Sequence, residues 1–304
     1  MSYARLVLCV ALTLIAAFGM PGMAQSYSFQ EFSIPHPPTS STVALGIDNF
    51  GAVVGEIRAG PVTYGFKRFS GGALKYPILD PNDPRYDTSV AGINSEGTMV
   101  GSYTGADGVL HGFVDQGGVF TTVDVGTGNQ TEIWGINYKG DFVGTVNFGE
   151  SSFFSSNGTI TQFMVPGSTT TLAYGLAADG TIVGCATRNG QNLAFIRNSV
   201  GAFRLFAVQG ASYTCAQGIS NGAGAVVGLY ETTQGAPVHG FLYNYRAGAV
   251  IGNPGQVETP SVLTLDYPNA QNTQVSGIND KGVVTGSAYL NSPPFFGFIA
   301  TPQQ

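Results

Sequence analysis

Charged residues are scarce in this chain of 304 residues. Asp, Glu, Lys and Arg make up 10% of it, against about 25% in an average soluble domain. No run of Lys and Arg appears anywhere in the sequence, whereas proteins that bind nucleic acid carry a basic patch or stripe. The composition therefore argues against nucleic acid as a partner, and it offers no basic surface for an anionic membrane.

Helical periodicity, cysteine and tryptophan are also sparse. No apolar pattern of helical period persists for three turns beyond the N-terminal segment, which argues against a helical fold. The chain has 3 Cys and 1 Trp, whereas its 44 Gly are about twice the usual share. A hydrophobic content of 43% disfavours a disordered chain. Few charges with many Gly, Thr, Ser and aromatic residues are typical of an exported all-β protein.

Residues 1–24 have the layout of a secretory signal peptide. Arg5 precedes an apolar run from Leu6 to about Phe18, and small residues follow at 22–24. The run is shorter than the roughly 20 residues that span a bilayer, and an uncleaved membrane anchor is the alternative. We expect a mature chain that begins near Gln25 and is secreted or periplasmic, with no membrane span after cleavage. Without Arg5 it has 11 basic and 18 acidic residues, a net charge of −7.

One phrase recurs six times: a Thr, three variable residues, then Gly-Ile-Asn-x-x-Gly-x-Val-Val-Gly or a near copy. Successive copies are 46, 43, 40, 43 and 59 residues apart. A regular period of this size indicates a repeat architecture. We interpret the recurring threonines as scaffold residues that satisfy backbone groups between structural units. The copies, repeats one to six below, begin at Thr42, Thr88, Thr131, Thr171, Thr214 and Thr273.

Each repeat resolves into four short strand candidates. The first ends in Gly-Ile and the second is the Val-Val-Gly stretch, with a turn such as Asn-Ser-Glu-Gly at 94–97 between them. Asn first and Gly fourth suit a type I turn closed by a glycine with positive φ. The third strand carries Gly-Phe, as at 112–113, and the fourth alternates apolar and polar residues, as at 120–125. Four-stranded units of about 40–50 residues are propeller blades.

The two ends of the chain complement each other. After Phe298 the sixth repeat stops within a few residues and lacks a fourth strand, whereas Phe29–Pro35 matches that missing strand. An N-terminal strand in that place would close the ring without a covalent bond. We therefore predict an all-β fold in which residues 25–304 form a single six-bladed β-propeller of four-stranded blades, closed by the N-terminal strand. An open solenoid is the alternative, and it would not require this complementarity.

The repeats resemble a known family. Gly-Ile-Asn-x-x-Gly-x-Val-Val-Gly, followed by His-Gly-Phe and Phe-Thr-Thr-Val-Asp, is similar to the extracellular HAF repeats of exported bacterial proteins. The resemblance covers about residues 26–300, with six copies in the same order and phase. Repeat four departs from it with Leu-Ala-Ala-Asp at 176–179, and repeat five has an extra residue in its turn. The resemblance implies export and a β-rich repeat fold, and it implies no activity.

Positions that break the repeat are the best candidates for function. Glu132 stands where other repeats have Val, Ser, Leu, Cys or Gln, and Trp134 lies two residues on, on the same side of the strand. A carboxylate beside an indole near a central funnel suits a sugar or a cationic ligand. A solvated acid beside a packing aromatic is the alternative. The predicted ligand-binding residues are Glu132, Trp134, Arg188, Tyr213 and Glu231, on a face that also carries Arg85, Tyr86, Asp87 and Glu150.

Two cysteines remain after the signal peptide. Cys185 ends the second strand of repeat four, and Cys215 starts the first strand of repeat five on the same face. A disulfide between blades is geometrically possible in an exported protein, provided that the two Cα atoms lie within about 7 Å. Two separately buried thiols are the alternative.

Metal and cofactor motifs are missing from the sequence. No Asp-rich calcium loop, His-x-x-x-His or Gly-x-Ser-x-Gly occurs. His111 and His239 occupy the same slot of repeats two and five, on opposite sides of a six-membered ring, so we expect them to be structural. Asp124 and Asp266 are equivalent residues that we interpret as strand-end caps. We predict neither a metal nor a cofactor.

Three functions are compatible with these residues. The leading hypothesis is an exported, non-enzymatic propeller that binds a glycan or another surface protein, because no compact catalytic constellation is present. The second is a hydrolase or lyase acting on an extracellular glycan, with Glu132 as acid or base, a second acid in Glu150 or Glu231, and Arg188 or Tyr213 assisting. The third is a purely structural surface protein.

Overall fold

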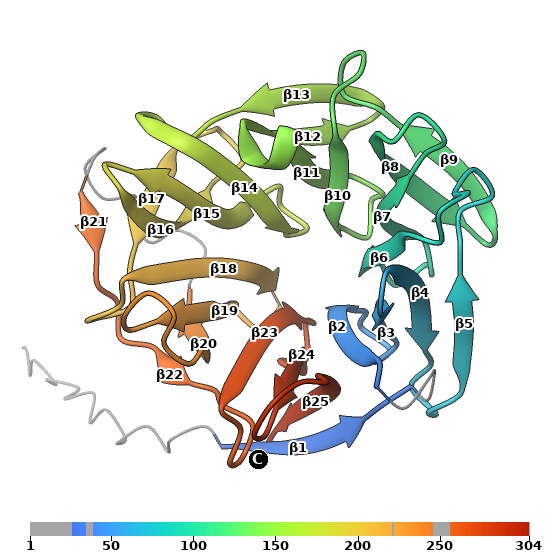
Figure 1. Ribbon diagram of the computed structural model, residues 1–304. Coiled ribbons are helices and arrows are strands. Elements are labelled where there is room, and N and C mark those ends of the chain that lie inside the picture. The colour runs from blue at the N-terminus through green and yellow to red at the C-terminus, as the bar shows by residue number, and fades with distance from the viewer. Residues whose placement is uncertain (1–25, 35–38, 221, 246–255, 304) are drawn as a thin grey trace, which may run out of the picture.

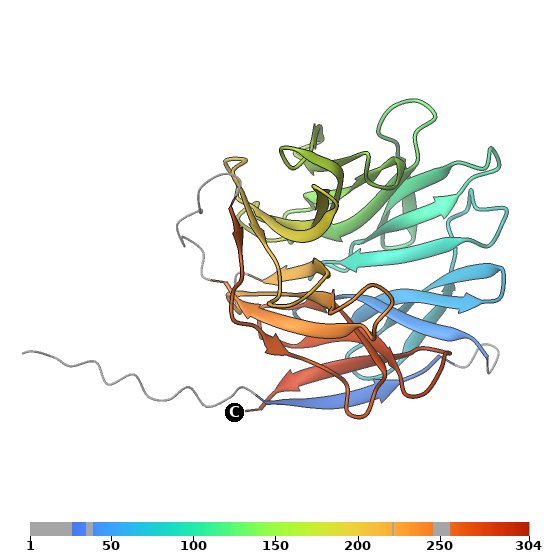
Figure 2. The ribbon, with the colours of Figure 1, turned by 60° about the vertical axis from the view of Figure 1, so that its left-hand side comes forward.

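Twisted antiparallel sheets stand like blades around a central axis in this all-β propeller (Figure 1, Figure 2). The structure is a computed structural model that describes residues 26–34, 39–220, 222–245 and 256–303. The predicted signal peptide at 1–24 lies outside these residues. Within the described ranges, no helix has both the length and the hydropathy of a membrane span.

Repeats one to three form one four-stranded sheet each, with strands paired in chain order. The strands are β2 (Ser41–Ile47), β3 (Val53–Ala59), β4 (Val62–Arg68), β5 (Leu74–Ile78), β6 (Thr88–Ile93), β7 (Met99–Thr104), β8 (Leu110–Gln116), β9 (Val119–Val123), β10 (Thr131–Ile136), β11 (Phe142–Val146), β12 (Ser151–Ser156) and β13 (Thr159–Phe163). A short 3₁₀ helix, η1 (Asn147–Gly149), lies between β11 and β12.

Repeats four and five share a nine-stranded sheet. Its strands are β14 (Ser168–Leu176), β15 (Ile182–Arg188), β16 (Gln191–Arg197), β17 (Phe203–Phe206), β18 (Tyr213–Ser220), β19 (Ala225–Glu231), β20 (His239–Asn244), β21 (Val257–Glu258) and β22 (Leu263–Thr264). Two parallel contacts join the halves: Asn192 pairs with Tyr213, and β21 pairs with β17. An ion pair between Arg204 and Glu258 holds β21 in place.

The N-terminal strand β1 (Tyr27–Phe32) completes the last blade, as predicted. That blade has the order β1–β25–β24–β23, with β23 (Asn272–Ile278), β24 (Val284–Tyr289) and β25 (Phe296–Pro302). β1 pairs with β25 along its whole length, from Tyr27 opposite Pro302 to Phe32 opposite Gly297. The first and last strands of the chain therefore lie side by side (Figure 1).

The first strand of each repeat lies nearest the axis, and we call these the inner strands: β2, β6, β10, β14, β18 and β23 (Figure 1). The predicted hairpin turns follow them. In repeat two the amide of Gly97 donates to the carbonyl oxygen of Asn94 at 3.0 Å, and Gly97 has a φ of 84°. The side-chain oxygen of Asn94 accepts from the amides of Glu96 and Thr98. Its Nδ2 donates to the carbonyl oxygen of Asn137 in the next repeat at 3.2 Å. This asparagine thus closes its own turn and binds the neighbouring blade.

The blades pack through a phenylalanine that recurs in the third strand. In repeat two, a Cβ on Gly101 would lie 1.9 Å from the carbonyl oxygen of Ser89 on the paired strand and 2.9 Å from the ring of Phe113, so the glycine makes room for both. A side chain at the glycine would overpack the core. The six rings have no exposed surface: Phe66, Phe113, Phe153, Phe195, Phe241 and Phe298.

The prediction that the repeat threonines satisfy backbone groups is confirmed. The hydroxyl of Thr131 accepts from the amide of Val125 at 3.1 Å, and that of Thr171 accepts from the amide of Val165 at 3.0 Å. Each of the six threonines is at most 1% exposed, where an unpaired amide would be costly. The other four donor amides belong to Ile34, Asp80, Val208 and Tyr267.

Candidate functional site at the channel mouth

The inner strands surround a narrow channel along the axis. Each strand carries a β-bulge just before its Gly-Ile or Gly-Leu pair, and a bulge re-aims a side chain. The bulged residues and these pairs line a void of about 80 Å³ at the waist of the channel. The bulged residues are Leu45, Ala91, Trp134, Tyr174, Gln217 and Ser276.

Glu132 is the only charged residue on the six inner strands, all of which are described. It lies opposite Thr145 of β11, and its Oε2 accepts a hydrogen bond from the Thr145 hydroxyl at 3.1 Å. The same hydroxyl oxygen accepts from the indole Nε1 of Trp134 at 3.3 Å. One threonine therefore positions both the carboxylate and the indole. We call the end of the channel at Glu132 the channel mouth.

Two tyrosines of the following repeats adjoin this pair. The rings of Trp134 and Tyr174 meet edge to face, with centroids 5.2 Å apart. Burial raises the pKa of the Tyr174 hydroxyl, and Tyr213 and Glu132 add to the shift. Burial, with a smaller contribution from Glu231, also raises the pKa of Tyr213. Both phenols are therefore neutral at physiological pH.

The surroundings of Glu132 disfavour the charged form of its carboxyl group. Burial raises its pKa, the hydrogen bond from Thr145 opposes that shift, and the charge of Glu56 raises the pKa further. Glu56 is itself buried and forms an ion pair with Arg58 at 2.5 Å. Among the described residues, no ion pair joins Glu132 to a cation. Its charge is compensated there by hydrogen bonding alone.

The other predicted residues lie farther out on the second strands. Glu231 stands opposite Tyr213 at the end of β19, and its Oε2 accepts from the amide of Gly235 at 3.2 Å. Arg188 is the last residue of β15. Its side chain lies against Gly167, because its Nε is 3.6 Å from the position that a Cβ would take on that glycine. The structure thus brings Tyr213, and not Arg188, into electrostatic contact with the tyrosine beside Trp134.

The acid pairs considered from the sequence are replaced by a different one. Glu150 binds the side chain of Asn147 at 2.9 Å, and within the described ranges no contact joins it to Glu132. Glu231 interacts with Tyr213 instead. The carboxylate that acts on Glu132 is Glu56, from repeat one. The reason is that the ring curves these two repeats toward a common axis.

Cys185 and Cys215 form a disulfide between repeats four and five, with Cα atoms 4.8 Å apart. It lies beside the channel mouth, because the Tyr213 hydroxyl is 3.9 Å from the Cys185 sulfur. Gln217 Nε2 donates to the Cys215 sulfur at 3.2 Å. One disulfide is consistent with an oxidising compartment.

His111 and His239 do not converge, and each has its own aspartate. His111 Nδ1 lies 2.7 Å from Asp124, and His239 Nδ1 lies 2.7 Å from Asp266. The imidazoles stack on a tyrosine of the second strand in both repeats, with centroids 5.3 and 5.2 Å apart. The two aspartates thus bind histidine side chains, which the interpretation as strand-end caps did not include.

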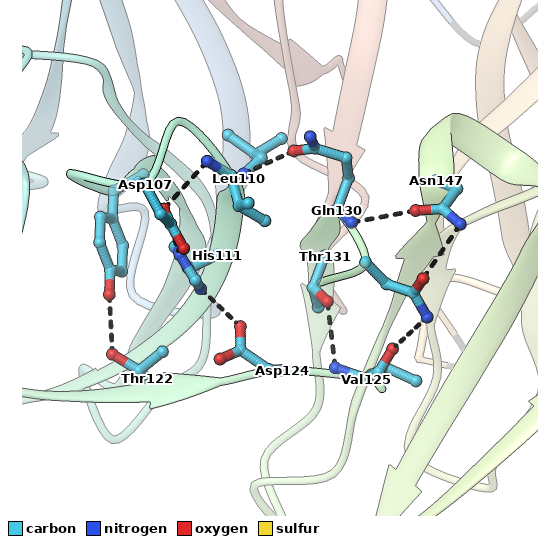
Figure 3. Close-up of polar contacts among 12 residues, drawn as sticks. Asp107, Leu110, His111, Thr122, Asp124, Val125, Gln130, Thr131 and Asn147 are labelled. Atoms are coloured by element: carbon cyan, nitrogen blue, oxygen red, sulfur yellow. Dashed lines mark hydrogen bonds and ion pairs between the residues drawn. The ribbon is translucent and has the colours of Figure 1, made fainter. Parts of the chain in front are cut away.

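Repeat two adds a second carboxylate to this arrangement (Figure 3). Asp107 Oδ1 lies 3.2 Å from His111 Nε2, whereas Asp124 contacts Nδ1. The imidazole therefore separates the two carboxylates. Throughout the described ranges, no group of three or more His, Cys, Asp or Glu residues has the arrangement of a metal site.

Thr145, Tyr174 and Glu56 also belong to the channel mouth, and none of them was among the residues predicted from the sequence. Tyr174 occupies the same bulge position as Trp134, so an alignment of the repeats was a sufficient signal for it. Thr145 follows from the strand register once the hairpin is placed. Glu56 belongs to a repeat two places away from that of Glu132, and no local pattern identifies it.

No protein-family model matches the chain, and no curated protein matches it. The resemblance to HAF repeats therefore has no specific support from these comparisons. Among solved structures, a catalytically inactive virginiamycin B lyase from Staphylococcus aureus with quinupristin shares 12% identity and a TM-score of 0.50, covering 90% of this chain and 99% of its own.

Two further solved structures have similar values. A streptogramin B lyase shares 15% identity with a TM-score of 0.49, covering 91% of this chain and 98% of its own. A neuraminidase-like protein of A/little yellow-shouldered bat shares 12% identity with a TM-score of 0.48, covering 92% and 99%. At these identities, the virginiamycin B lyase match shows the β-propeller fold alone.

Proposed function

We propose that this protein is an exported β-propeller that binds a ligand or partner at the channel mouth. The supporting observation is the lone charge of the inner strands, since Glu132 is half-buried beside Trp134 and Tyr174 without a cation among the described residues. A partly buried charge without an ion-pair partner costs folding free energy. Convergent polar groups among aromatic side chains are typical of ligand sites, so binding accounts for a residue that the scaffold alone would disfavour.

In this proposal Tyr213 belongs to the channel mouth, and Arg188 and Glu231 lie at its rim. Arg188 and Glu231 end the second strands of repeats four and five, next to the disulfide. They would contact the outer part of a ligand whose inner part reaches Glu132.

We also propose that the ring has six blades. A Cβ on Gly46 would lie 2.8 Å from the carbonyl oxygen of Ala91, and the equivalent contact on Gly277 is with Leu45 at 3.0 Å. Equivalent contacts join each repeat to the next, and the last of them joins repeat six to repeat one. The nine-stranded sheet would then be two four-stranded blades, joined by β21 and by the bridge between Asn192 and Tyr213.

Residues 25–304 would form one domain of the HAF type, exported by a signal peptide at 1–24. The repeat phrase and the disulfide support this assignment. N-terminal sequencing of protein recovered from the periplasm or the medium should find a start near Gln25. Protein retained in the cytoplasm with Met1 intact would contradict it.

Binding can be measured directly because Trp134 is the only tryptophan. Soluble oligosaccharides and small amines, added one at a time, should include at least one that changes Trp134 fluorescence saturably. Glu132→Gln should weaken that binding at least tenfold. Glu150→Gln is the matched control, because it removes an exposed carboxylate from the same face. Unchanged affinity in Glu132→Gln would contradict the proposal.

A glycan hydrolase or lyase is the second candidate. The observation that favours it is the raised pKa of Glu132 with a second carboxylate, Glu56, acting on it, because a general acid needs a raised pKa. An enzyme of this kind would release reducing ends or unsaturated products from a polysaccharide. The turnover should disappear in Glu132→Gln, whereas binding without turnover would favour the first proposal.

A further inference from the structure

The inner strands present a single charge, and it is negative. Glu132 supplies it, and the second carboxylate in range, Glu56, has its own cation in Arg58. The neighbouring phenols of Tyr174 and Tyr213 stay neutral, because burial holds their pKa values high. An added positive charge at the channel mouth would therefore meet one carboxylate that has no ion-pair partner among the described residues, and no competing cation from the inner strands.

The waist of the channel limits the size of a group that can lie between the bulged side chains, Trp134 and Tyr174 among them. Its void is about 80 Å³, whereas a cavity of about 150 Å³ holds one benzene molecule. A pyranose ring is at least as bulky as benzene and does not fit between the bulged side chains. A primary ammonium group on a methylene chain does fit.

The side chains around the waist match such a group. Trp134 and Tyr174 supply aromatic surfaces, and tryptophan is the side chain that attracts cations best. An ammonium group has three hydrogen-bond donors, which need acceptors. Glu132 does not line the void itself, but it lies beside Trp134, which shares Thr145 with it, and it supplies carboxylate oxygens at the channel mouth. Gln217, which does line the void, turns its Nε2 to the Cys215 sulfur and offers its Oε1.

We propose that the channel mouth binds a primary alkylammonium group, with Glu132 as its counter-ion and Trp134 and Tyr174 packed against it. This inference rests on the proposed binding function and names its ligand class. The group is either a free amine or the side chain of a lysine in a partner chain. Both present the same head to Glu132.

The test is a titration of Trp134 fluorescence at constant ionic strength. Butylammonium should give a saturable change, and butan-1-ol, its neutral counterpart, should give none. Glu132→Gln should weaken butylammonium binding at least tenfold, whereas Glu150→Gln should stay within twofold of the parent. Nα-acetyl-lysine amide separates the sources: tighter binding than butylammonium indicates a lysine side chain, and weaker binding indicates a free amine.

Three results would overturn the inference: equal binding of butan-1-ol, unchanged affinity in Glu132→Gln, or no saturable response to any ammonium probe. A thermal unfolding curve verifies that Glu132→Gln is folded. Loss of this half-buried carboxylate should leave that curve unchanged or move it to higher temperature. If a neutral oligosaccharide alters Trp134 fluorescence and no ammonium probe does, this inference fails while the proposed binding function stands.

Discussion

At the residue scale, the repeats serve as internal controls for one another, and Asp80 is the clearest exception. The position follows the fourth strand, where its amide binds the next repeat threonine. Other repeats bury an apolar side chain there, such as Ile34, Val125 or Val165. Repeat one buries a carboxyl group instead, since Asp80 is only 2% exposed. Its Oδ1 accepts from the Asn82 amide, and within the described part of the chain its Oδ2 has no hydrogen-bond partner. Burial raises the pKa of this carboxyl group.

We expect Asp80→Val to stabilise the protein by about 1–3 kcal/mol at pH 7, because it removes an unsatisfied buried oxygen. An acid whose pKa is raised on folding opposes folding once the pH exceeds its unfolded value near 3.9. The gain should therefore shrink as the pH falls toward 4. Urea unfolding of both proteins at pH 7 and pH 4 measures it, with Val125→Asp expected to destabilise. A less stable Asp80→Val at pH 7 would show that the carboxylate is needed.

His111 should contribute pH-dependent stability. Its pKa is lowered by burial, but the bonds to Asp124 and Asp107 outweigh that effect, so the net shift is upward. A raised histidine pKa stabilises the folded state fully below the unfolded value near 6.5, and this contribution is lost as the pH rises through the folded value. The advantage over His111→Gln should fall across that window, by less than about 1 kcal/mol because water screens the exposed aspartates. Asp107→Asn should flatten the profile, and a profile unchanged by it would contradict this account.

The sequence was informative about the site wherever one repeat could be compared with another. Glu132 and Trp134 stand out because their equivalents in other repeats are neutral or smaller. The effect of Glu56 on Glu132 could not be predicted, because it depends on the curvature that brings repeats one and three to a common axis. Local pattern identifies a residue that breaks the rule, but it does not identify the residue across the ring that acts on it.

At the scale of elements, the inner strands must approach one another closely. A Cβ on Gly135 would lie 2.4 Å from the carbonyl oxygen of Tyr174, closer than van der Waals contact permits. The bulge of one strand thus fits against the glycine of the preceding strand. The Gly of Gly-Ile is therefore a packing requirement, and a positive φ is not its cause, because Gly135 is absent from the residues with that conformation.

Gly135→Ala should destabilise the protein by about 1–3 kcal/mol, because the added methyl group pushes two inner strands apart. Gly71→Ala is the matched control, since a Cβ there would meet none of the described atoms within 4 Å. Thermal unfolding with far-UV circular dichroism compares the two. Equal melting temperatures for both variants would mean that the strands separate freely, against the close contact seen at Gly135.

The fourth strand of repeat five is the element that the sequence predicted least well. A regular blade was expected, whereas β22 has two residues and β21 pairs with the preceding repeat. The pairing of β21 with the preceding repeat depends on its contacts with β17. These include the ion pair between Arg204 and Glu258, two residues that are 54 positions apart in the sequence. The short-period strand pattern contains no information about such a long-range exchange.

At the scale of the whole molecule, two cross-connections hold the ring together at different places. The disulfide fixes repeats four and five, where Ala177 replaces the turn asparagine whose side chain links other repeats. It closes a separation of 30 residues. The pairing of β1 with β25 instead joins the two ends of the chain, and no covalent bond supports it.

The ring should therefore be most sensitive to loss of β1. Phe29 packs on Phe298 in the last blade, with centroids 5.4 Å apart, and Phe32 packs on Phe66 in the first, at 6.1 Å. A chain shortened to start at Ser33 loses both rings and exposes the edge of β25, so its melting temperature should fall by roughly 5–10 °C.

A peptide of residues 26–32, added in trans, should restore part of that loss by pairing with β25. A scrambled peptide of the same composition should not. Size-exclusion chromatography would also detect association of the truncated chain through its open edge. A truncated chain that melts at the parent temperature would mean that the N-terminal strand pairs with the last blade but does not stabilise the ring. In that case the inner-strand contacts, from Gly46 round to Gly277, would suffice to hold the propeller together.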